Sequence, residues 1–81
     1  MIKLPKEQRQ RVIVNAALDV LRDKGIMEVS FENVAPRTID KISASTVKSV
    51  FKTRDALWTA VIEADGTGKA REEAATLGFH A

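Results

Sequence analysis

Hydroxyl and basic side chains concentrate in one short stretch of the sequence, from Ser43 to Arg54. Within it Val47, Val50 and Phe51 recur at helical spacing, which predicts one apolar face that packs on a core. The polar residues that this helix would leave on its opposite side are Ser45, Thr46, Lys48, Ser49 and Lys52. Hydroxyl groups can exchange hydrogen bonds with base edges and ammonium groups can neutralise phosphates, so this side has the chemistry of a nucleic-acid contact.

Two hydroxyl residues predict where the helices of this stretch begin. Ser43 can cap a helix over residues 44–51, because its oxygen can accept from the free backbone N–H groups of the first turn. Thr53 can cap a following helix over residues 54–64 in the same way. The Asp-Gly-Thr-Gly sequence at 65–68 ends that second helix. The polar residues are therefore expected on a short helix with two defined ends.

A longer amphipathic helix is expected upstream, over residues 5–24. Proline is tolerated in the opening turn of a helix, as at Pro5, and Gly25 can take the left-handed conformation that ends one. The apolar residues that recur at helical spacing are Ile13, Ala16, Ala17, Val20 and Leu21. This spacing predicts a single apolar stripe that lies on the core.

A shorter helix is predicted after Ser30, which can serve as its cap. Val29 directly precedes this cap and Val34 is the fourth residue after it. These two positions form a hydrophobic staple, so we expect the two valines to pack together. Pro36 must stop or kink this helix at about the preceding residue, because proline removes a backbone hydrogen bond and clashes with the turn before it. The chain is therefore expected to turn here towards the hydroxyl-rich helix.

Several large apolar residues lie outside these stripes. Ile39 and Ile42 follow the proline and are expected to point inward, since burial of each would stabilise the fold. Trp58 and Ile62 widen the apolar side of the 54–64 helix beyond what a small core requires. The residues that we expect on a dimer surface are Trp58, Ile62, Leu77 and Phe79. The alternative, that these residues close the core, is equally open.

No segment has the alternating pattern of a β-strand, so the predicted class is all-α. The chain is expected to form one domain over residues 1–81, with four to five helices, the last of them a short one at about 68–77. It has no cysteine and one histidine, so we expect no disulfide, no metal site and no cofactor. It also has no long apolar run and no signal-type segment, so we expect a cytoplasmic protein without membrane contact.

Basic residues are distributed unevenly along the chain. From Met1 to Arg54 there are eleven Lys and Arg against six Asp and Glu, whereas the remainder has two against five. The net charge is only +2, but its positive part coincides with the hydroxyl-rich helix, as expected for the footprint of a polyanion. A solvated surface with chance asymmetry is the alternative.

The order of these signals resembles the N-terminal DNA-binding domain of the TetR/AcrR family of bacterial repressors. The resemblance covers about residues 9–62 and is carried by Arg11, Ile13, Ala16, Ala17, Leu18, Gly25, Val29, Ser30, Val34, Ala35, Ser43, Thr46, Val47 and Phe51. It continues through residues 53–57, Thr-Arg-Asp-Ala-Leu, which are similar to the Ser-Lys-Glu-x-Leu that opens the fourth helix in that family. The resemblance implies a helix-turn-helix within a homeodomain-like three-helix core, whose 44–51 helix reads DNA.

Three features depart from the pattern of that family. The connection that precedes Ser43 is longer, contains Pro36 and lacks the usual turn glycine, near Lys41. Lys48 stands where the family commonly has a tyrosine that contacts a phosphate; a lysine can neutralise the same charge. The 81 residues do not include the large C-terminal domain that binds ligand and forms the dimer, so we expect no effector-responsive repressor of the usual plan.

The residues and the resemblance together predict a small DNA-binding transcriptional regulator, a repressor, that acts as a homodimer on double-stranded DNA. The expected DNA-contacting residues are Arg37, Thr38, Lys41, Ser43, Ser45, Thr46, Lys48, Ser49, Lys52, Thr53 and Arg54. The alternative is a protein-binding module, carried by a phage or mobile element, that docks on a host regulator or polymerase. The sequence has no paired carboxylates, phosphate loop or nucleophile-base arrangement, so we do not expect an enzyme.

Overall fold

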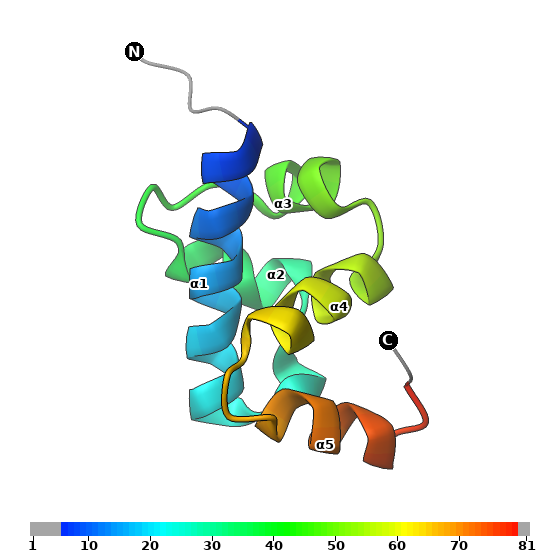
Figure 1. Cartoon of the computed structure of the whole chain (residues 1–81). Coiled ribbons are helices and arrows are strands. Elements are labelled where there is room, and N and C mark those ends of the chain that lie inside the picture. The colour runs from blue at the N-terminus through cyan, green and yellow to red at the C-terminus, as the bar shows by residue number, and fades with distance from the viewer. Residues whose placement is uncertain (1–5, 80–81) are drawn as a thin grey trace.

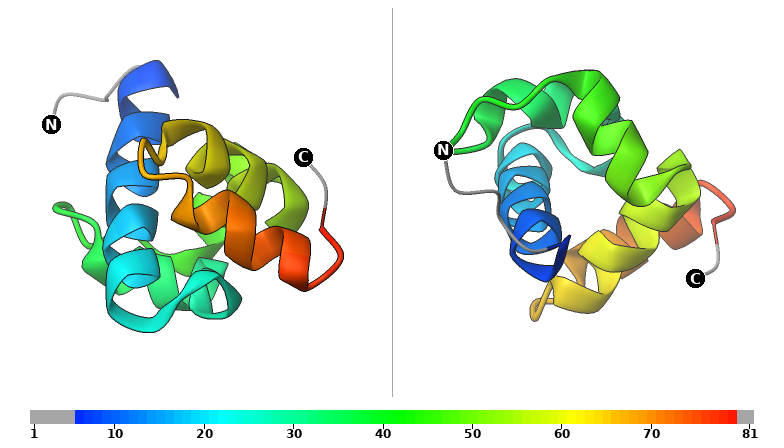
Figure 2. Two further views of the ribbon diagram at one scale, coloured as in Figure 1. Left: turned by 60° about the horizontal axis from the view of Figure 1, so that its bottom comes forward. Right: turned by 90° about the horizontal axis from the view of Figure 1, so that it is seen from above.

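The structure, a computed structural model, describes residues 6–79, and in that range it contains only helices and the turns between them (Figure 1). The α-helices are α1 (Lys6–Lys24), α2 (Phe31–Val34), α3 (Ala44–Phe51), α4 (Arg54–Ala64) and α5 (Lys69–Thr76), with 3₁₀ turns η1 (Ile26–Glu28) and η2 (Ala35–Arg37). The predicted all-α class is confirmed. The long α1 forms one side of the domain, and the other helices pack beside it around a shared centre (Figure 2). Pro5, at the predicted start of the first helix, lies outside the described residues.

The predicted starts of α2, α3 and α4 are confirmed by their caps. Ser30, Ser43 and Thr53 each accept a hydrogen bond from the backbone N–H three residues further along, at 3.2, 3.2 and 3.1 Å. These bonds satisfy donors that the first turn of a helix leaves free. As a result α3 and α4 begin where the sequence predicts, and only Lys52 and Thr53 separate them.

The proline after α2 ends that helix, as expected. α2 stops at Val34, and the chain continues as η2 with Pro36 in its first turn. Thr38 follows η2 and is almost completely buried, with 3% of its surface exposed. Its hydroxyl donates to the carbonyl oxygen of Ala35 at 2.8 Å and accepts from the backbone N–H of Ile42 at 3.0 Å. Thr38 therefore fixes the turn that leads into α3.

The burial of Thr38 overturns two predictions. Its hydroxyl is enclosed by the turn and cannot reach DNA, so its place among the expected DNA-contacting residues is wrong. Ile39, expected to point inward, is 86% exposed, because Thr38 takes the interior position in this turn. The prediction for Ile42 is confirmed, since this residue is partly buried against the core.

Replacement of Thr38 by valine should lower the free energy of unfolding by about 2 kcal/mol, because valine has a similar shape but leaves the N–H of Ile42 without its acceptor. Amide exchange at Ile42 should also become faster, which hydrogen exchange followed by NMR measures. Thr38→Ser is the control, because it keeps the hydroxyl and loses only a buried methyl group. A valine variant with wild-type stability and wild-type exchange at Ile42 would show that this hydrogen bond does not hold the turn.

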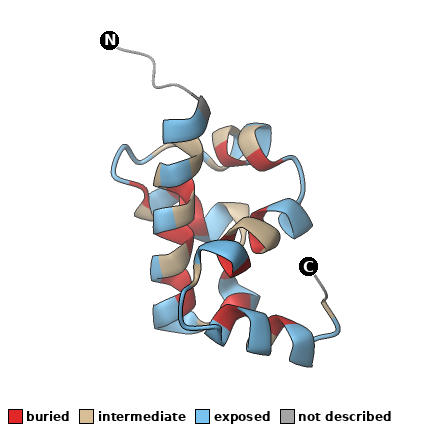
Figure 3. Cartoon of the chain, viewed as in Figure 1, coloured by how far each residue is buried: buried red, intermediate tan, exposed pale blue. Residues whose placement is uncertain are grey.

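The core lies where α1, α2, α3 and α4 meet, and the buried side of α5 closes one end of it (Figure 3). The large side chains that are fully buried are Ile13, Val20, Ile26, Val29, Val34, Val47, Leu57 and Val61. The predicted apolar stripe of α1 lies in this cluster, as do Val29 and Val34. The helical spacing in the sequence therefore identified most of the core correctly.

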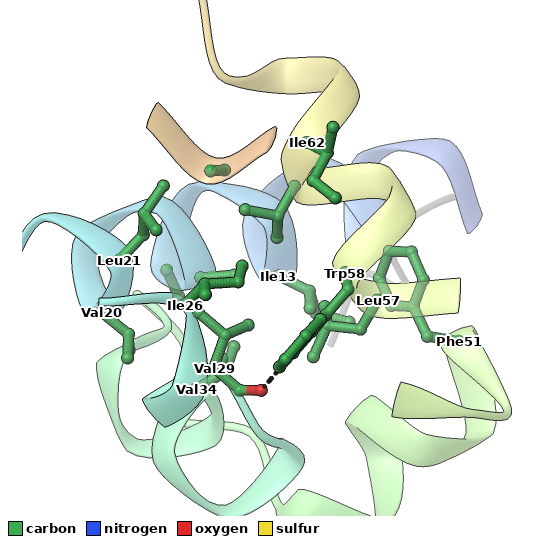
Figure 4. Packing of buried hydrophobic residues seen from close by; sticks show 14 of the residues in the cluster. Ile13, Val20, Leu21, Ile26, Val29, Val34, Phe51, Leu57, Trp58 and Ile62 are labelled. Carbon is green, nitrogen blue, oxygen red and sulfur yellow. Dashed lines mark hydrogen bonds between the residues drawn. The ribbon is translucent and has the colours of Figure 1, made fainter. Parts of the chain in front are cut away.

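Trp58 and Ile62, expected on a dimer surface, belong to this core as well, and Trp58 is only 8% exposed. The indole N–H of Trp58 donates to the carbonyl oxygen of Val29 at 2.8 Å (Figure 4). Phe79 packs edge-on against the indole, with ring centroids 5.4 Å apart. The dimer-surface prediction is therefore wrong for Trp58 and Ile62, because the C-terminal part of the chain packs on α4. Leu77, from the same predicted surface, is 48% exposed.

Candidate nucleic-acid interface

α3 has the two-sided character that the sequence predicts. Its buried side holds Val47 and Phe51, which pack into the core. We define the α3 face as the exposed serines within this helix, with the exposed lysines on it and at its two flanks: Lys41, Ser45, Lys48, Ser49 and Lys52. A helix whose one side is fixed by the core can present the other side rigidly to a partner.

Hydroxyl groups form a small network at the start of α3. Ser43 Oγ lies 3.0 Å from Ser45 Oγ and 2.9 Å from Thr46 Oγ1, and it also accepts the backbone N–H of Thr46. Thr46 is half-buried, so it lies at the edge of the α3 face. A hydroxyl can donate one hydrogen bond and accept two, so this network orients Ser45 and still leaves it capacity for an outside partner.

The α3 face carries three lysines, Lys41, Lys48 and Lys52, that are exposed to solvent. The ion pairs among residues 6–79 involve none of them. Positive charges gathered on one helix and its flanks, and not engaged in ion pairs within residues 6–79, attract a polyanion such as a phosphate backbone. The α3 face thus combines hydroxyl groups suited to base edges with ammonium groups suited to phosphates.

Arg37, expected to contact DNA, is held on α1 instead. Its guanidinium donates to Asp23 at 2.7 Å and lies 3.5 Å from Asp19. The hydrogen bond from Arg37 holds the pKa of Asp23 below its ordinary value, and the same bond raises the pKa of Arg37. The charge of Arg37 is therefore balanced within the fold, where it joins η2 to α1.

Arg54, another expected DNA contact, is also engaged within the fold. Its guanidinium donates to the carbonyl oxygens of Met27 and Val29, at 2.5 and 3.3 Å. It also lies 4.8 Å from the centroid of the Trp58 ring, at the distance of a cation–π contact. Thr53, next to it, is exposed but uses its hydroxyl to cap α4. The start of α4 is therefore tied to η1 and to Val29, which directly follows η1.

The acid stability of the fold should depend on Asp23 and Asp65. The pKa of Asp23 is lowered chiefly by Arg37, and that of Asp65 chiefly by the backbone N–H of Ala70, 2.8 Å away. A carboxylate with a lowered folded-state pKa stabilises the fold above its unfolded pKa of about 4, and this stabilisation is lost as the pH falls through the lowered value. We therefore expect the Tm to fall below about pH 4, and to fall less in Asp65→Asn. Thermal unfolding at several pH values tests this, and an unchanged acid dependence in the variant would contradict it.

The partners that sequence reasoning missed are carboxylates on α1. Asp19 and Asp23 lie four residues apart, which places them on the same side of a helix, but nothing in the sequence links them to Arg37. Within residues 6–79 no three His, Asp or Glu side chains gather into a potential metal site. The same part of the chain has no helix that is both long and apolar enough to cross a membrane.

The features on which a functional proposal can rest are therefore the α3 face and the turns that hold it. Comparison of the chain with protein-family models, with curated proteins and with solved structures gives no match. The resemblance to the TetR/AcrR DNA-binding domain accordingly rests on the residues named for it in the sequence.

Proposed function

We propose that this protein is a small DNA-binding transcriptional regulator, a repressor, that places α3 in the major groove of double-stranded DNA. The observation that supports this most is the α3 face, an exposed surface that combines serine hydroxyls with lysines that form no ion pair within residues 6–79. The major groove of B-form DNA is about 12 Å wide and admits one α-helix. The opposite side of α3 packs into the core, so the helix can enter the groove without any rearrangement of the fold.

In this arrangement the residues of the α3 face divide into two roles. Ser45 and Ser49 reach base edges, where a hydroxyl can donate or accept and its Cβ can touch a thymine methyl. Lys48 contacts a phosphate, which fixes the position of the helix without reading the sequence. Serine contacts discriminate bases weakly, so useful specificity requires two copies of the protein on two half-sites.

Binding to a duplex selected from random DNA, measured by fluorescence anisotropy at several salt concentrations, tests this proposal. Lys48→Ala should weaken binding to every sequence, by about eightfold at 0.1 M salt, and should reduce the salt slope by about 0.9. Ser49→Ala should instead change the sequence preference and leave the slope unchanged. The matched control is Lys24→Ala. Lys24 is an exposed lysine in the last turn of α1, and that end of the helix lies away from α3 (Figure 1). This substitution should change neither quantity.

Absence of duplex binding, or binding that does not depend on salt, would overturn the proposal. Sedimentation with and without the selected duplex tests the two-copy arrangement, which predicts two protein chains per duplex. One chain per duplex at saturation would exclude that arrangement.

The alternative role, docking on another protein, is supported by a small exposed apolar patch. Met27 and Leu77 are 63% and 48% exposed and lie at a shallow pocket of about 250 Å³ between η1 and α5. The apolar side of α4 does not support this role, because Trp58 and Ile62 on that side are buried. A chain that fails to bind duplex DNA, but retains a host protein that Leu77→Asp releases, would favour this alternative.

A further inference from the structure

Two lysines of the α3 face adopt a backbone conformation that favours glycine. Lys41 has φ of 50° and Lys52 has φ of 64°, and the other residues with positive φ in the described part of the chain are glycines. At positive φ the Cβ of an L-residue crowds the backbone, whereas glycine adopts the same conformation without that cost. Both lysines flank the same helix, one before its cap and one at its end.

The conformation of Lys52 is imposed by the elements on both sides of it. Its φ and ψ of 64° and −50° belong to a γ-turn of the rare, strained kind, in which the N–H of Thr53 donates to the carbonyl oxygen of Phe51 at 2.6 Å. The N–H of Lys52 itself donates to the carbonyl oxygen of Lys48 at 2.7 Å. A single residue thus joins the last turn of α3 to the cap of α4, so this backbone shape is required whichever side chain stands there.

The conformation of Lys41 is set by the turn that Thr38 organises. The N–H of Lys41 donates to the carbonyl oxygen of Thr38 at 3.1 Å, and the next N–H, that of Ile42, donates to the hydroxyl of Thr38. The side chains of Lys41 and Lys52 are exposed and make no hydrogen bond or ion pair with residues 6–79. Replacement of either lysine by glycine would therefore remove no stabilising contact within the described structure.

We propose that Lys41 and Lys52 are a pair of phosphate clamps at the two ends of α3, kept at strained positions because their charge binds the two strands of a B-form DNA duplex. This inference rests on the proposed function. Strained backbone positions that the surrounding fold enforces concentrate at ligand-binding sites. The eight residues of α3 span about 12 Å, close to the width of the major groove, and the clamp arrangement places the lysines beyond its two ends against phosphates on opposite strands. A single strand offers only one row of phosphates.

Three substitutions at each position separate charge from backbone strain. Glycine removes both, so Lys41→Gly and Lys52→Gly should each raise the Tm by about 3 °C while reducing the salt slope of duplex binding by about 0.9. Alanine removes the charge but keeps the strain, so it should reduce the slope without raising the Tm. Arginine keeps both and should behave as the wild type in both measurements.

The double glycine variant should bind a duplex about sixtyfold more weakly than the wild type at 0.1 M salt. Its loss of affinity for a single strand of the same length should be smaller, because only one clamp can be used there. The control is Lys24→Gly, an exposed lysine that is the last residue of α1, which should lower the Tm or leave it unchanged and should leave the slope unchanged.

The outcomes distinguish this inference from the proposed function. Wild-type protein that binds no duplex overturns both. Duplex binding that Lys48→Ala weakens, but that the glycine variants do not, overturns the clamps alone. A Tm that falls in both glycine variants would show that the lysines stabilise the fold. Equal losses of affinity for the duplex and for the single strand would show that the pair does not span two strands. Either result also overturns the clamps.

Discussion

Replacement of Trp58 by alanine should lower the free energy of unfolding by about 3–5 kcal/mol. The whole stability of a domain of this size is expected to be about 4–12 kcal/mol, so much of the variant should be unfolded in mild denaturant. Urea denaturation followed by circular dichroism measures the change, since Trp58 is the single tryptophan and the variant loses its fluorescence.

The size of this effect follows from the number of separate contacts that Trp58 makes. Its ring fills the space among α4, η1 and α2, and it packs against Phe79. Its N–H donates to the carbonyl oxygen of Val29, to which Arg54 also donates. Loss of the indole would leave a cavity and would remove the ring that lies under the guanidinium.

Trp58→Phe is the informative control for this prediction. It retains most of the apolar volume and removes the N–H, so it should cost about 1–2 kcal/mol. Val29 keeps one donor in this variant, from Arg54. If Trp58→Ala instead left stability near that of the wild type and changed self-association in sedimentation, the tryptophan would be an interface residue and its burial by the C-terminal segment would not hold in solution.

The start and end of most helices could be predicted because they depend on nearby residues. Ser43 and Thr53 cap helices that begin directly after them, and Pro36 stops α2 through its own missing N–H. Each of these effects acts within about one turn of helix, which is the range that a local pattern covers.

Burial of an apolar helix side could not be predicted in the same way. The spacing of Trp58 and Ile62 shows that one side of α4 is apolar, but it does not show which element covers that side. α5 contacts α4 through a buried side made of Ala70 and Ala74, whose small side chains allow a close approach. Because these side chains are small, the hydrophobic pattern that predicts α5 in the sequence is weak.

The exposed side of α3 could be predicted from one helix, whereas the internal partners of Arg37 and Arg54 could not, because they lie far away in the sequence. The exposure of Ser45, Lys48 and Ser49 follows from the periodicity around Val47 and Phe51, whereas Lys41 and Lys52 lie outside that helix. Arg37 and Arg54 looked equally available for DNA, but their partners lie 14 and 25 residues away. A charged residue can be assigned to a binding surface only when the fold shows that its charged group is not already engaged by internal partners.

Gly25→Ala should lower the free energy of unfolding by about 2–3 kcal/mol, because Gly25 adopts a conformation that is essentially restricted to glycine. Its φ is 93°, as its role at the end of α1 requires, but its ψ of 171° differs from the left-handed helical value predicted from the sequence. The N–H of Gly25 still closes α1 by donating to the carbonyl oxygen of Leu21 at 2.9 Å. The chain then enters η1 directly.

The space around Gly25 adds to this cost. A Cβ at this position would lie 3.0 Å from Oε1 of Glu73, the atom that accepts the backbone N–H of Ile26 at 3.0 Å. Relief of this contact requires Glu73 to move, and movement weakens the hydrogen bond by which α5 holds η1. The effect of the substitution should therefore spread from the end of α1 to the packing of α5.

Gly66→Ala is the matched control, because a Cβ there meets nothing within 4 Å and its φ lies outside the left-handed range. Thermal unfolding by circular dichroism should show a fall in Tm of about 10 °C for Gly25→Ala and almost none for Gly66→Ala. If the contact with Glu73 contributes, Gly25→Ala should cost less in a Glu73→Ala background than in the wild type. Equal costs in the two backgrounds would assign the whole effect to the backbone conformation, and a stable Gly25→Ala variant would contradict the strained turn between α1 and η1.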